Sequence, residues 1–413
     1  MSSMTKKERM ITAFKNKGEP DRVPVSPDIS NGIPARFTNK NFWEIFYYKK
    51  PPVWDAYLDA AVFFDFEVCL EAPGLLGVDP DKLYCGGLLI NTTGNIEVEN
   101  EILLIDADKL TVKYTYRMRN GDLQEVIVFP KDNPPWCKEP LLKNLDEDEQ
   151  GIIELISVNP WEKSPRLFKN IHDKVGDKGV LETRIQIPTS WWFFMRGNMN
   201  KAIMDFYDNK ATLKKILGAY FEYGLEEVKA ACSLLGTDAL VFGGCNASMS
   251  VISPAIYKDY NLKFVKEATC ICKKNGIISH MHVGGNSMEI LEMVKDSELD
   301  VIEPLERPPS GNTNLDEVKK NYGHKFCLKG NVNTFKTLEL GTPDDVSLES
   351  LKCICDAAAG GGFVLSSGDQ VPTKASYENI FAMVSAAKKF GSYPLNLHKI
   401  SEEMDRLKNS KKF

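Results

Sequence analysis

The sequence predicts a (β/α)8 barrel, and three features of its 413 residues lead to that prediction. Beyond residue 150, short runs rich in β-branched residues alternate with segments that have the apolar spacing of helices. Two more such runs near the N-terminus bring the predicted strands to eight. A region of period two, residues 86–130, interrupts the alternation, and we interpret it as an insertion.

The first half of the chain supplies two strands and the insertion. Within the insertion, Asn120-Gly-Asp122 separates two alternating runs, which is a strong hairpin signal. In order, the predicted elements are helix 5–17, strand 23–25, a helical stretch over 43–63, strand 65–70 and the hairpin strands 111–118 and 123–129. The whole chain, residues 1–413, is predicted to be a single barrel domain, with 86–175 as an inserted β-rich and helical subregion.

The second half of the chain carries the regular alternation. Its strands are predicted at 179–187, 239–245, 276–283, 300–304, 326–331 and 362–368. Its helices are predicted at 199–206, 213–234, 254–274, 288–295, 315–322, 343–359 and 377–390. In a barrel of this kind the active site lies at the C-terminal ends of the strands, so the chemistry is expected there.

Composition narrows the class of protein. A hydrophobic content of 43% and a charged content of 26% are ordinary for a globular enzyme, and a formal net charge of −6 argues against nucleic-acid binding. The N-terminus has no apolar segment of signal-peptide length, and no run of eighteen apolar residues suits a membrane span. The ten cysteines follow no disulfide spacing, which favours reduced thiols and a cytoplasmic protein.

Two of the five histidines lie on one predicted strand, within Gly276-Ile-Ile-Ser-His-Met-His-Val-Gly-Gly-Asn286. Because alternate residues of a strand share a face, His280 and His282 point the same way. Histidine is the commonest nitrogen ligand of zinc, and two imidazoles on one face can both reach one ion. The alternative is a pair of core histidines held by backbone carbonyls, although burying two imidazoles without partners is costly.

Other polar residues fall at the ends of predicted strands. Glu303 closes one strand and Asp369 follows another, so either carboxylate could complete a metal site with the two histidines. Two imidazoles, one carboxylate and an open position form a catalytic zinc arrangement. Asp65 opens the second strand, and Asn246 follows the Gly-Gly-Cys turn that ends strand 239–245.

A series of motifs in the order of the chain resembles the uroporphyrinogen decarboxylase superfamily. They include Glu19-Pro-Asp-Arg-Val-Pro-Val25, Met204-Asp-Phe-Tyr-Asp208, Ile252-Ser-Pro-Ala-Ile-Tyr257, the His280 segment, Gly341-Thr-Pro-Asp-Asp-Val346 and Gly361-Gly-Phe-Val-Leu-Ser-Ser-Gly368. The resemblance spans nearly the whole chain, with a poor match over 86–175, and it implies a (β/α)8 barrel. One branch of the superfamily decarboxylates uroporphyrinogen without a cofactor, and Asp65 matches its aspartate. The Arg-rich N-terminal segment of that branch is absent here, which leaves a polycarboxylate substrate without charge partners.

The other branch consists of cobamide-dependent methyltransferases that bind zinc through His-x-Cys and a later Cys. The matching positions here are His280, His282 and Asp369, so both cysteines are replaced. Because such a ligand set is harder, it favours activation of an oxygen substrate over a thiol. The resemblance therefore implies methyl transfer from a small O-methylated compound, for example a methoxyaromatic, to a Co(I) corrinoid. A methylcobamide:thiol methyltransferase and an accessory subunit without activity remain as alternatives.

The remaining expectations concern substrate and partners. The chain has no Asp-x-His-x-x-Gly corrinoid motif, so the corrinoid is expected on a separate corrinoid-binding protein. Asp65, Asn246 and Glu303 are expected to orient the substrate or transfer a proton, and Trp191 and Trp192 to stack its ring. Ordinary barrel packing explains the two tryptophans equally well. The sequence leaves a homodimer open.

Overall fold

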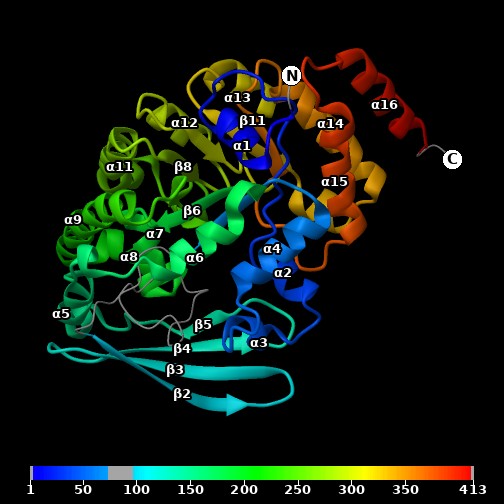
Figure 1. Cartoon of the computed structure of the whole chain (residues 1–413). Helices are drawn as coiled ribbons and strands as arrows, with labels where there is room; N and C mark the ends of the chain where they lie inside the picture. The colour runs from blue at the N-terminus through cyan, green and yellow to red at the C-terminus, as the bar shows by residue number, and fades with distance from the viewer. Residues whose placement is uncertain (1–2, 73–95, 411–413) are drawn as a thin grey trace.

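The protein is built around a curled parallel sheet of seven strands, in a TIM-barrel-like α/β fold (Figure 1). The computed structural model describes residues 3–72 and 96–410. The strand order is β1-β6-β7-β8-β9-β10-β11, and all neighbours are parallel. The strands are β1 (Val68–Ala72), β6 (Gly179–Ile185), β7 (Ala239–Gly243), β8 (Ile278–His282), β9 (Val301–Glu303), β10 (Cys327–Val332) and β11 (Phe363–Ser367).

An eighth segment lies between the two edges of this sheet. Val25 forms a parallel bridge with Leu365 of β11, and Ser26 N donates to Leu365 O at 2.9 Å. On the other side, Glu67 N donates to Val25 O at 3.0 Å, directly before β1 begins. The predicted strand at 23–25 therefore connects the edges of the sheet, although it is too short to form a regular strand.

Helices surround the sheet, as Figure 1 shows. They are α1 (Lys6–Phe14), α2 (Gly32–Phe37), α3 (Phe42–Phe46), α4 (Val53–Phe64), α5 (Leu145–Ile156), α6 (Arg166–Val175), α7 (Pro188–Arg196), α8 (Met199–Asp208), α9 (Lys210–Leu234), α10 (Pro254–Ile256), α11 (Leu262–Lys274), α12 (Met288–Val294), α13 (Leu315–Tyr322), α14 (Pro343–Ala357), α15 (Tyr377–Phe390) and α16 (Leu397–Ser410). Among residues 3–72 and 96–410, no helix combines the length and the apolarity that a membrane span requires.

The predicted alternation of strands and helices is confirmed in the second half of the chain, with differences at particular elements. The predicted helical stretch 43–63 is two helices, α3 and α4, because Pro51 and Pro52 lie between them and cannot continue a helix. Helices α2, α7 and α16 were not predicted.

A second sheet is antiparallel, with the order β2-β3-β4-β5 (Figure 1). Its strands are β2 (Glu97–Ile105), β3 (Lys109–Arg117), β4 (Leu123–Pro130) and β5 (Trp136–Glu139). Strands β3 and β4 pair across Asn120-Gly-Asp122, but the sheet also contains two strands outside that hairpin and extends to Glu139. Of the predicted insertion 86–130, residues 86–95 lie outside the described residues.

Helix α1 covers the N-terminal end of the parallel sheet. Three of its side chains are fully buried there, those of Met10, Ala13 and Phe14. They pack against the first or second residue of six strands. Those six residues are Val180, Ala239, Ile278, Val301, Cys327 and Val364. Arg9 of the same helix donates to the buried carboxylate of Glu67 at 2.7 Å. With this end filled by apolar side chains, the polar groups of the interior lie above it, toward the C-terminal ends of the strands.

Candidate active site

Both predicted histidines are buried inside the parallel sheet. His280 and His282 lie on β8, with exposed fractions of 0% and 6%, and β8 pairs with β7 on one side and β9 on the other. Their placement on one face follows from the period of two. The two imidazoles nevertheless contact different partners. Those of His280 lie deep in the interior, and those of His282 lie at the C-terminal ends of the strands, which we call the mouth of the barrel.

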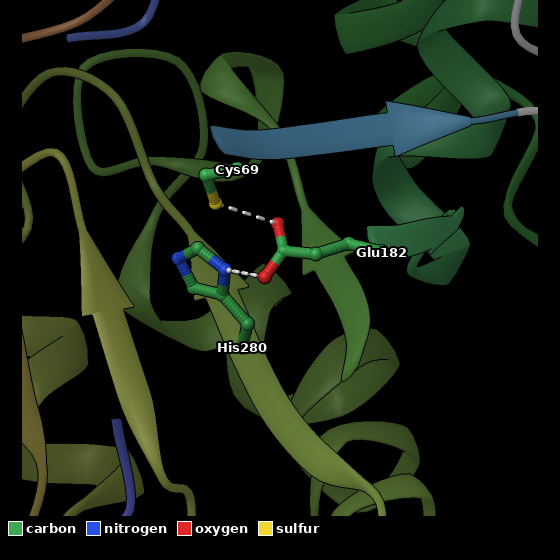
Figure 2. Close-up of side chains that lie close together, drawn as sticks. All are labelled: Cys69, Glu182 and His280. Carbon is green, nitrogen blue, oxygen red and sulfur yellow. Dashed lines mark hydrogen bonds and ion pairs between the residues drawn. The ribbon is translucent and has the colours of Figure 1, made fainter. Parts of the chain in front are cut away.

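The deep partners of His280 come from two other strands. His280 Nδ1 lies 2.8 Å from Glu182 Oε1, and Cys69 Sγ donates to Glu182 Oε2 at 3.3 Å (Figure 2). Burial by itself would lower the pKa of His280, but the charges of Glu182 and Glu303 outweigh it and raise the pKa to about 9. Burial and the charge of Glu182 raise the pKa of the Cys69 thiol well above its ordinary value.

Glu303, at the end of β9, lies between the two histidines. Its Oε1 is 3.2 Å from His282 Nδ1 and 3.5 Å from His280 Nε2. Its Oε2 accepts a hydrogen bond from the buried ammonium of Lys329 on β10. Burial would raise the pKa of Glu303, but Lys329 and the histidines hold it well below the ordinary value. Glu303 is therefore an ionised carboxylate that orients the imidazole of His282.

His282, Cys245 and Asp369 form a second group, the mouth group, at the C-terminal ends of three strands. His282 Nε2 lies 3.6 Å from Cys245 Sγ, and Cys245 Sγ lies 3.3 Å from Asp369 Oδ2. Cys245 follows β7 and Asp369 follows β11, so three strand ends supply one sulfur, one nitrogen and one oxygen, a set that could hold a metal ion. Asp369 has φ 142°, a backbone region that residues with a side chain rarely adopt and that is often found at functional sites.

Space beside this group depends on a glycine. A Cβ on Gly284 would lie 2.6 Å from Cys245 Sγ and 3.1 Å from Asp369 Oδ2. Any side chain here would therefore fill the position next to both atoms. The Gly-Gly pair after His282 leaves the thiol and the carboxylate accessible to a ligand.

Further carboxylates gather around the mouth. Burial and the charge of Asp369 raise the pKa of Glu306 to about 7. Burial also raises the pKa of Asp28, against the opposing charge of Lys329. Both shifts come first from burial, which favours the neutral form of these carboxyl groups.

The structure brings some of the predicted site residues together. His282 and Asp369 both belong to the mouth group, and Glu303 contacts Nδ1 of His282, on the side of the ring away from that group. His280 contacts Glu182 and Cys69 instead of Asp369, so the predicted set of His280, His282 and Asp369 is not one cluster. Asn246 lies next to Cys245 in a single helical turn, half-buried.

Asp65 lies at the opposite end of the sheet. It terminates α4, three residues before β1, and its side chain is 60% exposed and pairs with Lys6 at 2.6 Å and with Lys388. The structure therefore does not bring Asp65 together with the histidines. The aspartate precedes β1 and lies at the covered end, whereas the histidines lie toward the C-terminal ends of the strands.

The two tryptophans on α7 are engaged in packing. Trp191 stacks on Tyr220 of α9 at 4.3 Å between ring centroids, and Trp192 Nε1 donates to Ala202 O of α8 at 3.3 Å. Both are almost completely buried. The alternative of ordinary barrel packing accounts for these contacts, and stacking on a substrate ring stays a prediction.

Cys245 is the residue that the sequence analysis missed. Its signal was its position at the end of the predicted strand 239–245, directly before Asn246, but the cysteines were considered only through their spacing. Gly243 and Gly244 have φ of 104° and 158°, so the alternation of side chains ends before Cys245 and its direction could not be inferred from the strand.

Comparison with known proteins identifies the family of the chain. Residues 180–390 match the family model of uroporphyrinogen decarboxylase (URO-D), and the matched part contains Cys245, His282, Glu303 and Asp369. The chain belongs to the uroporphyrinogen decarboxylase family. A comparison with curated protein sequences gives no significant match.

The fold of the chain is similar to those of solved structures. A methyltransferase from Methanosarcina mazei is similar with a TM-score of 0.62 and 19% sequence identity, over 94% of this chain and 99% of that one. The fold is therefore shared with a methyltransferase over nearly the whole of both chains. A sugar phosphate isomerase/epimerase from Parabacteroides distasonis is a weaker match, with a TM-score of 0.31 and 14% identity over 54% of this chain and 74% of that one, and it carries no functional argument.

Proposed function

We propose that this protein is a zinc-dependent methyltransferase. It would move a methyl group from a small O-methylated compound, such as a methoxyaromatic, to the Co(I) corrinoid of a partner protein. The observation that supports this proposal is the group of Cys245, His282 and Asp369 at the mouth, in a fold shared with a methyltransferase.

The mouth group fits zinc by its distances and its donors. A tetrahedral ion with a sulfur at about 2.3 Å and a nitrogen at about 2.05 Å separates those two atoms by about 3.6 Å. The distance from Cys245 Sγ to His282 Nε2 is 3.6 Å, and the distance from Cys245 Sγ to Asp369 Oδ2 is 3.3 Å. Three protein ligands leave a fourth position for a substrate, as catalytic zinc sites do. Cys245 thus takes the place that the sequence analysis gave to His280.

When bound, zinc would supply a Lewis acid that polarises the ether oxygen of the substrate. The protein's own groups prepare the ligands. With zinc bound and His282 neutral, Glu303 would accept from Nδ1 and so leave the lone pair of Nε2 for the ion. Lys329 holds the other oxygen of Glu303 and keeps that carboxylate ionised. Gly284 keeps the space beside Cys245 and Asp369 open to the substrate.

The donor set also bears on the substrate. The resemblance drawn from the sequence implies two thiolates in methyltransferases that act on thiols, whereas the mouth group here has one thiolate and one carboxylate. A harder set favours an oxygen substrate. Cys245 is itself the observation that favours the second candidate, a methylcobamide:thiol methyltransferase, because it restores one soft ligand. The cofactor-free decarboxylase loses its support, because it depended on Asp65.

The test combines metal content with methyl transfer. Purified protein is loaded with Zn²⁺, mixed with cob(I)alamin and a panel of methoxyaromatics, and followed by the absorbance of methylcobalamin. We expect zinc-dependent methylation of cobalamin that is lost in Cys245→Ala and His282→Ala and retained in Cys327→Ala, a buried cysteine outside the mouth group. Demethylation of methylcobalamin by thiols alone would establish the second candidate. Metal binding without turnover on either substrate class would leave the accessory role.

A further inference from the structure

A second set of metal-type donors lies beneath the mouth and shares no residue with it. Cys69 is on β1, Glu182 on β6 and His280 on β8, so three strands contribute one side chain each. Figure 2 shows the carboxylate of Glu182 between the other two side chains, with one oxygen toward the thiol and the other toward the imidazole. The distances are 3.3 Å from Cys69 Sγ to Oε2 and 2.8 Å from His280 Nδ1 to Oε1.

The donor chemistry of this group suits zinc. One atom from each of the three side chains lies within 4.8 Å of the other two, and zinc ligands around one ion are about 3.3–3.6 Å apart. Small side-chain rotations would therefore close the group around an ion. Because both oxygens of Glu182 face the group, bidentate binding would provide a fourth donor atom.

A divalent ion that binds here would exchange with protons of the group, because zinc takes a cysteine as the thiolate and a histidine as the neutral imidazole.

The second nitrogen of His280 agrees with this exchange. Nε2 is buried and makes no hydrogen bond, although it lies 3.5 Å from Glu303 Oε1. With an ion on Nδ1, the proton of the neutral imidazole would be on Nε2 and could be donated to Glu303. A carboxylate behind the imidazole is the usual arrangement of a metal-binding histidine.

We propose that Cys69, Glu182 and His280 bind a second divalent ion of the zinc class, closed off from the mouth and structural in role. Such an ion would join β1, β6 and β8 within the barrel. The inference does not rest on the proposed function, because the two groups use different ligands.

The test counts ions at the two groups separately. Chelator-treated, full-length protein is titrated with Zn²⁺, and the bound metal is measured by mass spectrometry after free ions are removed. We expect two ions per chain in the wild type and in Cys327→Ala, and one each in Cys69→Ala and Cys245→Ala. With Co²⁺ instead of Zn²⁺, the thiolate-to-cobalt absorption should fall by about half in either of the two single-site variants, since each site has one thiolate.

The outcomes separate the two sites. One ion in the wild type that survives Cys69→Ala and is lost in Cys245→Ala would overturn the interior site and leave the proposed function intact. One ion lost in Cys69→Ala and kept in Cys245→Ala would support the interior site and overturn the mouth centre. An absence of bound metal would overturn both. If Cys69→Ala does not fold, Glu182→Gln decides, with one ion expected and two contradicting the proposal.

Discussion

His282 Nδ1 lies 3.2 Å from Glu303 Oε1, and this contact fixes which nitrogen of His282 faces the mouth. Replacing Glu303 by Gln should weaken zinc binding at the mouth about 10–100-fold, because the orienting carboxylate of a metal-bound histidine is lost. A competition titration with a chromophoric chelator measures this change. The exposed Glu317→Gln is the control, and unchanged affinity in Glu303→Gln would exclude the orienting role.

Gly284→Ala tests the open position beside the mouth group. The added Cβ would lie 2.6 Å from Cys245 Sγ, too close for both to keep their places. We expect the mouth ion to be lost, or to bind much more weakly, while the fold persists. Gly218→Ala on α9 is the matched control, because a Cβ there meets nothing within 4 Å, and it should bind metal like the wild type. Full occupancy in Gly284→Ala would show that the metal does not sit beside this glycine.

Asp65→Asn tests the position of Asp65 at the covered end of the barrel. Because its ion pairs with Lys6 and Lys388 are largely exposed, the free energy of unfolding should change by no more than about 1 kcal/mol. Metal content and methyl transfer should match the wild type. Urea unfolding and the cobalamin assay measure the two quantities. A large loss of activity at unchanged stability would return Asp65 to the candidate catalytic residues.

Metal-free protein should lose stability as the pH rises toward 9. The pKa of His280 is raised from 6.5 to about 9 in the folded protein. Its contribution is therefore fully present below about pH 6.5 and disappears as the pH passes through about 9, with a span on the order of 3 kcal/mol. Urea unfolding between pH 6 and 9.5 measures this. His280→Gln should show a smaller slope, and equal slopes in both proteins would assign the effect to other groups.

The sequence predicted the strands well because their β-branched runs have clear limits at glycines and prolines. It also placed His280 and His282 on one face. It could not show that they serve different groups, because two residues along a strand advance by about 6.6 Å, which separates the imidazoles by one layer of the interior. Cys245 was missed because two glycines precede it, and Asp65 was included although even the predicted strand 65–70 begins with it, at the end away from the histidines. Contacts between strands that are not neighbours, such as Glu182 on β6 with His280 on β8, depend on how the sheet curls, which no local pattern records.

Helix α1 has a kinetic consequence for the proposed reaction. With Met10, Ala13 and Phe14 filling the N-terminal end, α1 closes that end among the described residues. In the proposed reaction, a partner that seats its corrinoid over the opposite end would block the path of small molecules there. The methyl donor would then have to bind before the partner, and the demethylated product would leave after the partner withdraws. A helix on the far side of the barrel would thus set the order of binding and release.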